Sequence, residues 1–476
     1  MVERSIYQNI SPLDHRYYLS NREAFDELQS FLSEEAVVHS CLRVEAALLG
    51  CYVERFLASD PGLLRAVDGL PAAVSADEVY QEEEKTHHNI RALVNVIKRK
   101  VPEELRPFVH LGATSVDILD TAASLRLRDS VRKVVLPRLL AVEERLVALV
   151  RRTAATAQVG RTHGQHAIPI TFGFAMAEYV SRLGKAIQEI EMRSRQLKGK
   201  LAGAVGAYNA TSLVARDPEE LERSFLTRLG LAPSEHSTQL VEPEYSLRLL
   251  LEMNVAFGIV ANLADDLRNL QRSEVGEVRE EFGSTQVGSS TMPQKRNPWN
   301  SEHVKSLWKA FAPRVVTFFM DQISEHQRDL TNSASSRFVG EYVAGFVAAL
   351  CRMETILASL QVNDERMRKN LELTGDLVLS EAAYILLATA GEPDAHEVVR
   401  KMTMRCEEGG TRLLAEIKAD APVWHLISAQ LEKTLGIDPE EFFSNPALYR
   451  GRAAEKAVAI ADRYAGVIAS IREELK

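Results

Sequence analysis

The residues best suited to chemistry lie in one short segment, residues 283–302, which reads GSTQVGSSTMPQKRNPWNSE. It places the paired serines Ser289 and Ser290 a few residues before Lys295 and Asn297. A hydroxyl, a cation and an amide donor so close together could hold a carboxylate while a proton is transferred. A solvated glycine- and serine-rich loop followed by a helix cap is the structural alternative, and the combination of three kinds of donor favours the chemical interpretation.

A second segment, residues 159–173, reads VGRTHGQHAIPITFG. Glycines and a proline interrupt an otherwise helical pattern around His163 and His166. A histidine in such a break can present a ring nitrogen to a cleft and exchange a proton near neutral pH. A lone histidine is more often structural, so the residues alone leave both interpretations open.

A third segment, residues 109–121, reads VHLGATSVDILDT and predicts the start of a helix. Thr114 and Ser115 precede the helical pattern, and Asp117 and Asp120 lie in its first turns. Hydroxyls and backbone N–H groups at a helix start can bind a carboxylate or a phosphate. The same residues can cap the helix, and the two roles are compatible.

Two further segments carry polar groups that could bind a ligand. Residues 85–90, KTHHNI, place adjacent histidines beside an amide, at a spacing too close to form a metal site alone. Residues 326–337, HQRDLTNSASSR, place Arg328 and Arg337 among hydroxyls, which suits phosphate or carboxylate recognition. A solvated, salt-bridged surface explains the second segment equally well.

Long helices must position these segments. The clearest lies between residues 249 and 270, where apolar residues alternate spacings of four and three, a heptad seam typical of packing against near-parallel neighbours. The residues of this seam are Leu249, Met253, Ala256, Val260, Leu263, Leu267 and Leu270. We therefore predict an all-α fold with three domains: a helical domain over 1–110, a central bundle of long helices over 111–365 that carries the segment 283–302, and a small helical domain over 366–476.

Composition narrows the function classes. The chain of 476 residues has 57 Lys and Arg against 66 Asp and Glu, a net charge of −9 that argues against a nucleic-acid or anionic-membrane binder. Its four cysteines lie far apart and show no metal-ligand spacing, so we expect no metal site. The first residues lack the apolar core of a secretory signal, and we expect a cytoplasmic location.

Together these segments resemble the fumarase/aspartase superfamily, whose signature GSSxMPxKxNP is matched by residues 288–298. The other segments follow in the family's chain order, and the resemblance covers most of the sequence. It implies a mostly helical, three-domain fold that assembles as a homotetramer, with each active site built from three subunits. It also implies a small-molecule substrate and neither a metal nor an organic cofactor.

Within the superfamily the chain is most similar to the adenylosuccinate lyases. The resemblance implies a β-elimination that releases fumarate from adenylosuccinate and from the succinylated aminoimidazole carboxamide ribotide. It makes Ser289 the general base and His163 the general acid. The residues it assigns to substrate binding are Arg16, Tyr17, His87, His88, Asn89, Thr114, Ser115, Gln239, Lys295, Asn297, Arg328, Ser333 and Arg337.

Two stretches depart from the adenylosuccinate lyase pattern. Residues 86–89, THHN, stand where an Arg-His-Asp run is usual, and LVEPEYSLR follows Gln239 where a run rich in Arg and Asp is common. Both departures affect nucleotide recognition more than the elimination. One alternative is therefore another lyase or a carboxymuconate cycloisomerase of the superfamily, and His163 argues against the cycloisomerase. The other alternative is a non-catalytic helical assembly protein, which the intact Ser289 and Lys295 argue against.

Overall fold

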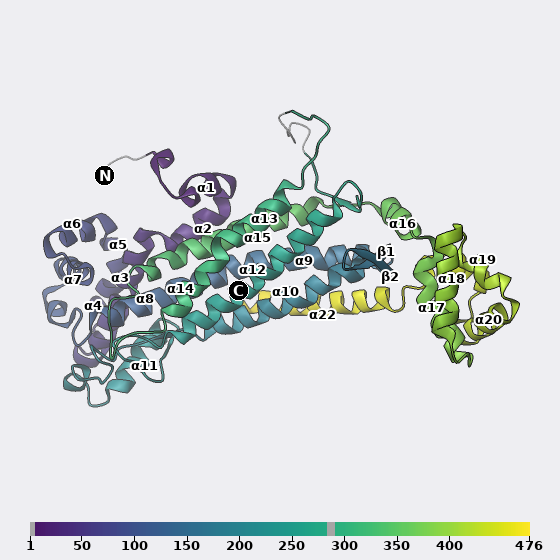
Figure 1. Ribbon diagram of the computed structural model, residues 1–476. Helices are drawn as coiled ribbons and strands as arrows, with labels where there is room; N and C mark the ends of the chain where they lie inside the picture. Colours follow the sequence, from purple (N-terminus) through teal and green to yellow (C-terminus); the bar gives the residue numbers. More distant parts are fainter. Residues whose placement is uncertain (1–4, 283–290) are drawn as a thin grey trace.

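The computed structural model describes residues 5–282 and 291–476. It is an elongated helical molecule in which the bundle separates an N-terminal group of short helices from a C-terminal group (Figure 1). The predicted all-α fold is confirmed. Within the described residues the sheet is confined to three two-stranded pairs: β1 (Ala157–Thr162) with β2 (Gln165–Thr171), β3 (Lys198–Gly199) with β4 (Ala232–Pro233), and β5 (Val278–Arg279) with β6 (Gln361–Val362).

The first two helices, α1 (Arg16–Ser20) and α2 (Arg22–Leu32), pack against the core of the central bundle. The five helices after them pack around a core of their own: α3 (Glu34–Phe56), α4 (Pro61–Asp68), α5 (Leu70–Ala73), α6 (Ala76–Thr86) and α7 (Asn89–Lys100). The core joins apolar residues of α3 and α7 to those of α11 (Pro218–Arg228) and to Ile118, Ala122 and Leu125. The core of this region therefore includes residues well beyond the predicted boundary at 110.

The central bundle has its own, larger core. Its helices are α8 (Ser115–Ser130), α9 (Leu136–Arg152), α10 (Phe172–Arg195), α12 (Glu244–Leu270), α13 (Trp299–Phe311), α14 (Val315–Met320), α15 (Val339–Ser359) and α22 (Ala453–Glu474). A π-helical turn, Val131–Val135, joins α8 to α9 without a break. Six members of the predicted seam on α12, Leu249 through Leu267, are buried in this core, and Leu270 packs against it.

The C-terminal helices form a third core at the far end of the bundle (Figure 1). They are α16 (Asp364–Glu372), α17 (Ser380–Thr389), α18 (Ala395–Gly409), α19 (Leu413–Ala419), α20 (Ala421–Leu435) and α21 (Pro439–Ser444). The last helix, α22, leaves this group and runs back along the bundle, where Ala457, Ala461 and Tyr464 are buried. The single segment predicted over 366–476 is thus divided between two cores.

Three helical stretches are long and apolar enough to cross a membrane by length and composition alone: 34–56, 244–270 and 335–359. Between 61% and 67% of the residues in their most apolar windows are buried inside the fold. Helix packing therefore accounts for most of the apolar surface of these stretches.

Candidate functional site

The start of α8 is held by a buried ionic network. Thr114 is the residue before the helix, and its N–H donates to Oδ2 of Asp117 at 2.8 Å. The other oxygen of Asp117 binds Nζ of Lys200 and accepts the N–H of Ala202 at 3.2 Å. Both side chains of this ion pair are fully buried. Thr114 and Ser115 thus sit on a rigid helix start whose first-turn N–H groups could bind an anion.

Gln239 and Arg328 meet beside the same helix. Nη1 of Arg328 donates to Oε1 of Gln239 at 3.0 Å. Two residues later the N–H of Val241 donates to Oδ2 of Asp120, one turn into α8, at 3.0 Å. Burial raises the pKa of Asp120 to about 6, although the charges of Lys200 and Arg328 act in the opposite direction. Four predicted binding residues, Thr114, Ser115, Gln239 and Arg328, are therefore gathered around one end of α8.

The turn at residues 86–89 joins α6 to α7. His87 adopts a left-handed conformation with φ of 49° at the end of α6, and His88 caps α7 by accepting the N–H of Arg91 at Nδ1, 3.2 Å away. His87, His88 and Asn89 are exposed. Burial lowers the pKa of the partly buried His110, but its 2.6 Å bond to Glu45 leaves that pKa raised overall. Helix α7, which follows the turn, contacts α8.

Ser333 and Arg337 lie on the exposed segment between α14 and α15. The charge of Arg337 acts on the hydroxyl of Tyr80 on α6, so the segment approaches the N-terminal helices. The N–H of Ser333 is used in a turn with the carbonyl of Leu330 at 3.1 Å. The structure places both residues on the N-terminal side of the bundle without a direct bond to Arg328.

Lys295 and Asn297 belong to a second group at the start of α13. Ser289 lies outside the described residues. The exposed Lys295 ends a turn in which its N–H donates to the carbonyl of Met292 at 3.0 Å. A hollow of about 1350 Å³ beside it is rich in cations, which suits a ligand with two carboxylates. The cationic residues are Arg268, Arg272, Arg279, Lys295 and Arg296.

Arg16 and Tyr17 are brought close to this second group rather than to the first. The hydroxyl of Tyr17 lies 3.1 Å from Nε2 of His303, which is on α13. Burial lowers the pKa of His303, and the charges of Arg352 and Arg16 lower it further. The sequence interpretation did not single out His303, because a histidine inside a helical pattern carries no local signal.

His163 lies at the tip of a β-hairpin instead of in a simple helix break. β1 and β2 pair Arg161 with His166 and Thr162 with Gln165, which leaves His163 and Gly164 as the turn. Their φ values of 54° and 76° are both left-handed, as a type I′ turn requires. His163 is exposed, so its ring can reach a ligand or another chain.

His166 has a structural position on the same hairpin. Burial lowers its pKa, and the charge of Arg161 lowers it further, which favours the neutral ring. Its Nδ1 lies 3.4 Å from Oγ1 of Thr374, just beyond α16. The two histidines of the segment therefore differ: His166 attaches the hairpin to the C-terminal helices, and His163 faces outward.

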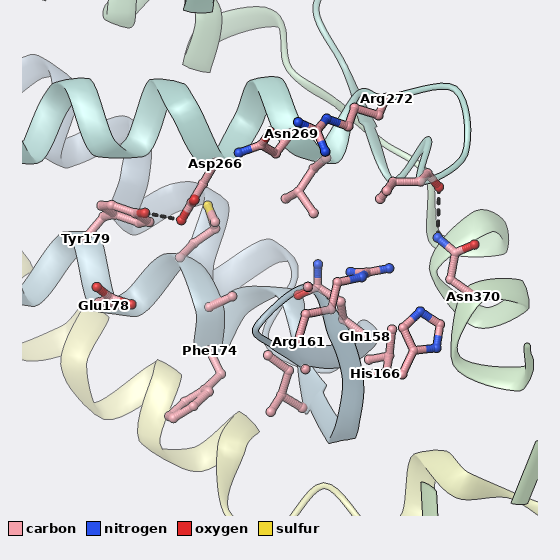
Figure 2. A pocket seen from close by; sticks show the side chains of 18 of the residues that line it. Gln158, Arg161, His166, Phe174, Glu178, Tyr179, Asp266, Asn269, Arg272 and Asn370 are labelled. Carbon is pink, nitrogen blue, oxygen red and sulfur yellow. Dashed lines mark hydrogen bonds between the residues drawn. The ribbon is translucent and has the colours of Figure 1, made fainter. Parts of the chain in front are cut away.

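A hollow of about 1070 Å³ lies behind the hairpin, between α10, α12 and α16 (Figure 2). Arg161, His166 and Asn370 surround one side, and Asn269 and Arg272 at the end of α12 lie across from them. His163 does not line this hollow. The hollow therefore lies beside the base of the hairpin and not beside its tip.

The long helix of the bundle separates the two ends of the molecule. Ser115 begins α8, the π-helical turn continues it, and Arg152 ends α9. A helical run of this length spans about 55 Å at 1.5 Å per residue. Thr114 and the hairpin that follows α9 lie at opposite ends of this run (Figure 1). One chain therefore does not bring His163 and Ser115 into a common pocket.

Residues 5–282 and 291–476 present neither a cluster of metal ligands nor a reactive thiol. No group of three or more His, Cys, Asp or Glu side chains that could hold a metal ion occurs there. The four cysteines form no disulfide bonds, and burial raises the pKa of the Cys41 thiol to about 12. These thiols therefore lack the exposed, low-pKa environment of a nucleophile.

Comparison with known proteins accounts for most of the chain. The family model described as "Lyase" matches residues 31–310, and the one described as "Adenylosuccinate lyase C-terminal" matches residues 324–442. Adenylosuccinate lyase of Pyrococcus horikoshii is 32% identical over 94% of this chain and 96% of that protein. N-acetyl-S-(2-succino)cysteine lyase of Dickeya dadantii is 30% identical over 81% of this chain and 82% of that protein.

A solved structure shares the architecture. The 3-carboxy-cis,cis-muconate lactonizing enzyme from Pseudomonas putida aligns with a TM-score of 0.76 at 25% identity. The alignment covers 96% of this chain and 100% of that one. The whole length of the molecule, including the N- and C-terminal helical groups, is thus common to the two structures.

Proposed function

The chain belongs to the fumarase/aspartase superfamily of lyases, most similar to its adenylosuccinate lyases, and from this membership we propose that it releases fumarate from adenylosuccinate, leaving AMP. The observation that carries the proposal is the 32% identity to an adenylosuccinate lyase over 94% of the chain. The match to an adenylosuccinate lyase C-terminal model over 324–442 also supports it. The succinylated aminoimidazole carboxamide ribotide of purine biosynthesis is a second substrate of the same proposal, and the cytoplasm is the proposed location.

The elimination requires a base and an acid. Ser289 removes the proton from the carbon beside a carboxylate, and His163 protonates the nitrogen as the carbon–nitrogen bond breaks. The intermediate state places a second negative charge on that carboxylate. Lys295 and Asn297, together with N–H groups at the start of α8, would stabilise this charge, since donors fixed in advance need not reorganise during the reaction.

The remaining substrate-binding assignments are part of the same proposal. Thr114, Ser115 and Gln239 hold the substrate at the start of α8, with His88 beside the succinyl group. Arg16, Tyr17, Arg328, Ser333 and Arg337 hold the nucleotide, and His87 and Asn89 take the place of the Arg and Asp usual there. Arg328, already bonded to Gln239 at 3.0 Å, would link the two halves of the substrate.

We also propose that each site is assembled from several chains of a homotetramer. Two observations support this. The run of α8 and α9, about 55 Å long, separates the hairpin that carries His163 from Ser115 in one chain. In addition, large apolar side chains are exposed on α14 and the segment after it, a surface typical of a subunit interface. These residues are Val316, Phe319, Met320, Ile323, Leu330 and Phe338.

A second candidate function is elimination of a thiol from a 2-succino thioether. The 30% identity to N-acetyl-S-(2-succino)cysteine lyase favours it, as does THHN at 86–89, which lacks the usual phosphate-facing Arg. The acid–base chemistry would be the same, and the leaving atom would be sulfur. The two candidates therefore differ in how residues 86–89 recognise the substrate and not in the roles of Ser289 and His163.

The deciding experiment gives the purified protein adenylosuccinate or N-acetyl-S-(2-succino)cysteine and follows fumarate in both cases. Turnover of the first with release of AMP supports the main proposal, and turnover of the second alone favours the second candidate. The Ser289→Ala variant is expected to lose several orders of magnitude in kcat while light scattering still reports a tetramer. A monomer in solution would contradict the shared site.

A further inference from the structure

One buried carboxylate connects three parts of the molecule. The side chain of Glu277 is fully buried, and both of its oxygens are occupied. Gln158 Nε2 donates to it at 2.7 Å, and Arg161 donates through Nη1 at 3.1 Å and Nη2 at 2.5 Å. Asn370 Nδ2, from α16, donates at 2.8 Å. A single anion thus binds β1 of the hairpin and the first C-terminal helix.

The backbone of Glu277 is itself fixed to the bundle. Its N–H donates to the carbonyl of Leu270 at the end of α12, and its carbonyl accepts the N–H of Asn363, each at 2.9 Å. The next residues, Val278 and Arg279, pair with β6. The position of the carboxylate is therefore set by the end of the long helix α12 and not by a loop.

The contact with Arg161 determines where the tip of the hairpin lies. Arg161 is two residues before His163, and a two-residue turn leaves little freedom between them. Arg161 and Gln158 point toward the side of the hollow that faces Asn370 (Figure 2). The second strand is attached separately, through His166 and Thr374. Without Glu277, the strand that leads into His163 would keep only its pairing within the hairpin and its apolar packing.

The same short segment holds the start of α13. Oε1 of Glu280 accepts the N–H of Ser301 at 2.9 Å and its hydroxyl at 2.6 Å, and Oε2 accepts the N–H of Asn300 at 3.2 Å. This carboxylate caps a helix whose own first residues follow Lys295 and Asn297 directly. The carboxylates at 277 and 280 thus attach the hairpin and the start of α13 to one fixed segment.

We propose that Glu277 is a positioning residue that sets the place of His163 through Arg161. The proposal rests on the proposed role of His163 as the general acid. Proton transfer needs the ring nitrogen within hydrogen-bond reach of the departing group, and a displacement of about 1 Å can cost about 10²-fold in rate. Because the carboxylate of Glu277 is fully buried and bonded through both oxygens, we expect its loss to affect the chemical step more than substrate binding.

The test compares Glu277→Gln with a matched control, Glu191→Gln. Glu191 is a buried carboxylate on α10 that binds Arg132 at 2.8 Å and Arg195 at 2.5 Å, and it contacts none of the predicted site residues. We expect Glu277→Gln to lower kcat about 10- to 100-fold with KM changed less than about threefold. We expect Glu191→Gln to keep kcat within about twofold. Deuterium exchange in residues 157–171 should rise in the first variant only.

Several results would overturn the proposal: an unchanged kcat in Glu277→Gln, an equal loss in Glu191→Gln, or unchanged exchange in the hairpin. If Glu277→Gln does not assemble, Arg161→Gln is judged by the same criteria, and Arg161→Lys should recover part of the loss because it keeps the charge. If the wild type turns over neither succinyl substrate, the proposed function fails. The exchange measurement then decides whether Glu277 holds the hairpin.

Discussion

The start of α8 and the β1–β2 hairpin both carry predicted site residues, and they differ in how they are held. At the start of α8, Asp117 combines a local contact, the N–H of Thr114, with a fully buried ion pair to Lys200. The hairpin depends on Glu277, which lies 116 residues beyond Arg161 in the sequence. The buried network at α8 gives a partly buried, pre-formed binding surface, whereas Glu277 holds the base of an exposed turn. The first arrangement suits a substrate-binding site and the second a residue that must reach into another chain.

The largest test of this contrast is His163→Gln. We expect kcat to fall about 10²- to 10⁴-fold, the range for loss of a general acid, with the thermal midpoint unchanged because the side chain is exposed. Kinetics with adenylosuccinate and a thermal scan measure the two effects. A small loss of rate would show that the exposed turn does not carry the acid.

Mixing variants sharpens the same test. His163→Gln and Ser115→Ala tetramers, each impaired alone, should regain activity when their subunits are exchanged. With random mixing roughly a quarter of the sites would receive both intact residues, if these come from different chains of a closed oligomer. If the subunits are shown to have exchanged and activity does not recover, His163 and Ser115 of one site come from the same chain.

The next largest effect is expected at the start of α8, from Asp117→Asn. The change leaves the fully buried Lys200 without its counter-ion, which should cost about 3–5 kcal/mol of the free energy of unfolding. Urea denaturation measures the loss. As a control, Glu365→Gln removes an exposed ion pair with Lys369 and should not change the urea midpoint measurably. Equal midpoints for the two variants would contradict the buried network.

Asp120 tests the same region by pH. Its folded pKa of about 6 lies above the ordinary 3.8, so the folded protein holds this proton more tightly than the unfolded chain. The stabilising effect is complete below pH 3.8 and disappears as pH rises through 6; its loss should amount to about 2–3 kcal/mol. Asp120→Asn should abolish this dependence, so that the variant is the more stable of the two at pH 7. Denaturation series at pH 4, 5, 6 and 7 provide the comparison.

The smallest expected effect concerns the turn itself. Gly164 has φ of 76° and open space where a Cβ would lie, so Gly164→Ala introduces backbone strain alone, about 1 kcal/mol. Faster deuterium exchange across residues 157–171 should report it. Gly466→Ala, in the helix α22 and also in open space, should instead stabilise slightly. If Gly466→Ala destabilised the protein as much as Gly164→Ala, the left-handed conformation of the turn would not be the cause of the destabilisation.

The same contrast explains what the sequence could predict. The seam on α12 and the start of α8 at Thr114 were predicted because apolar spacing and capping residues act within a few turns. The hairpin was missed: GRTHGQH was interpreted as a break in a helix, although a glycine after His163 also permits a two-residue turn. Glu277 and the return of α22 to the bundle could not be predicted, because their partners are set by tertiary packing far along the chain.

The π-helical turn at Val131–Val135 has a geometric consequence for the long helix. An additional residue in one turn rotates everything after it by about 100° about the helix axis. Before the turn, Ile118, Ala122 and Leu125 face the N-terminal core, whereas Leu127 already packs in the bundle core. After the turn, Leu136 and Leu139 face the bundle core. The widened turn thus rotates the apolar face of the helix, so that one continuous helix contributes residues to two cores. Deleting a single residue there would keep the helix but direct its second half away from its partners.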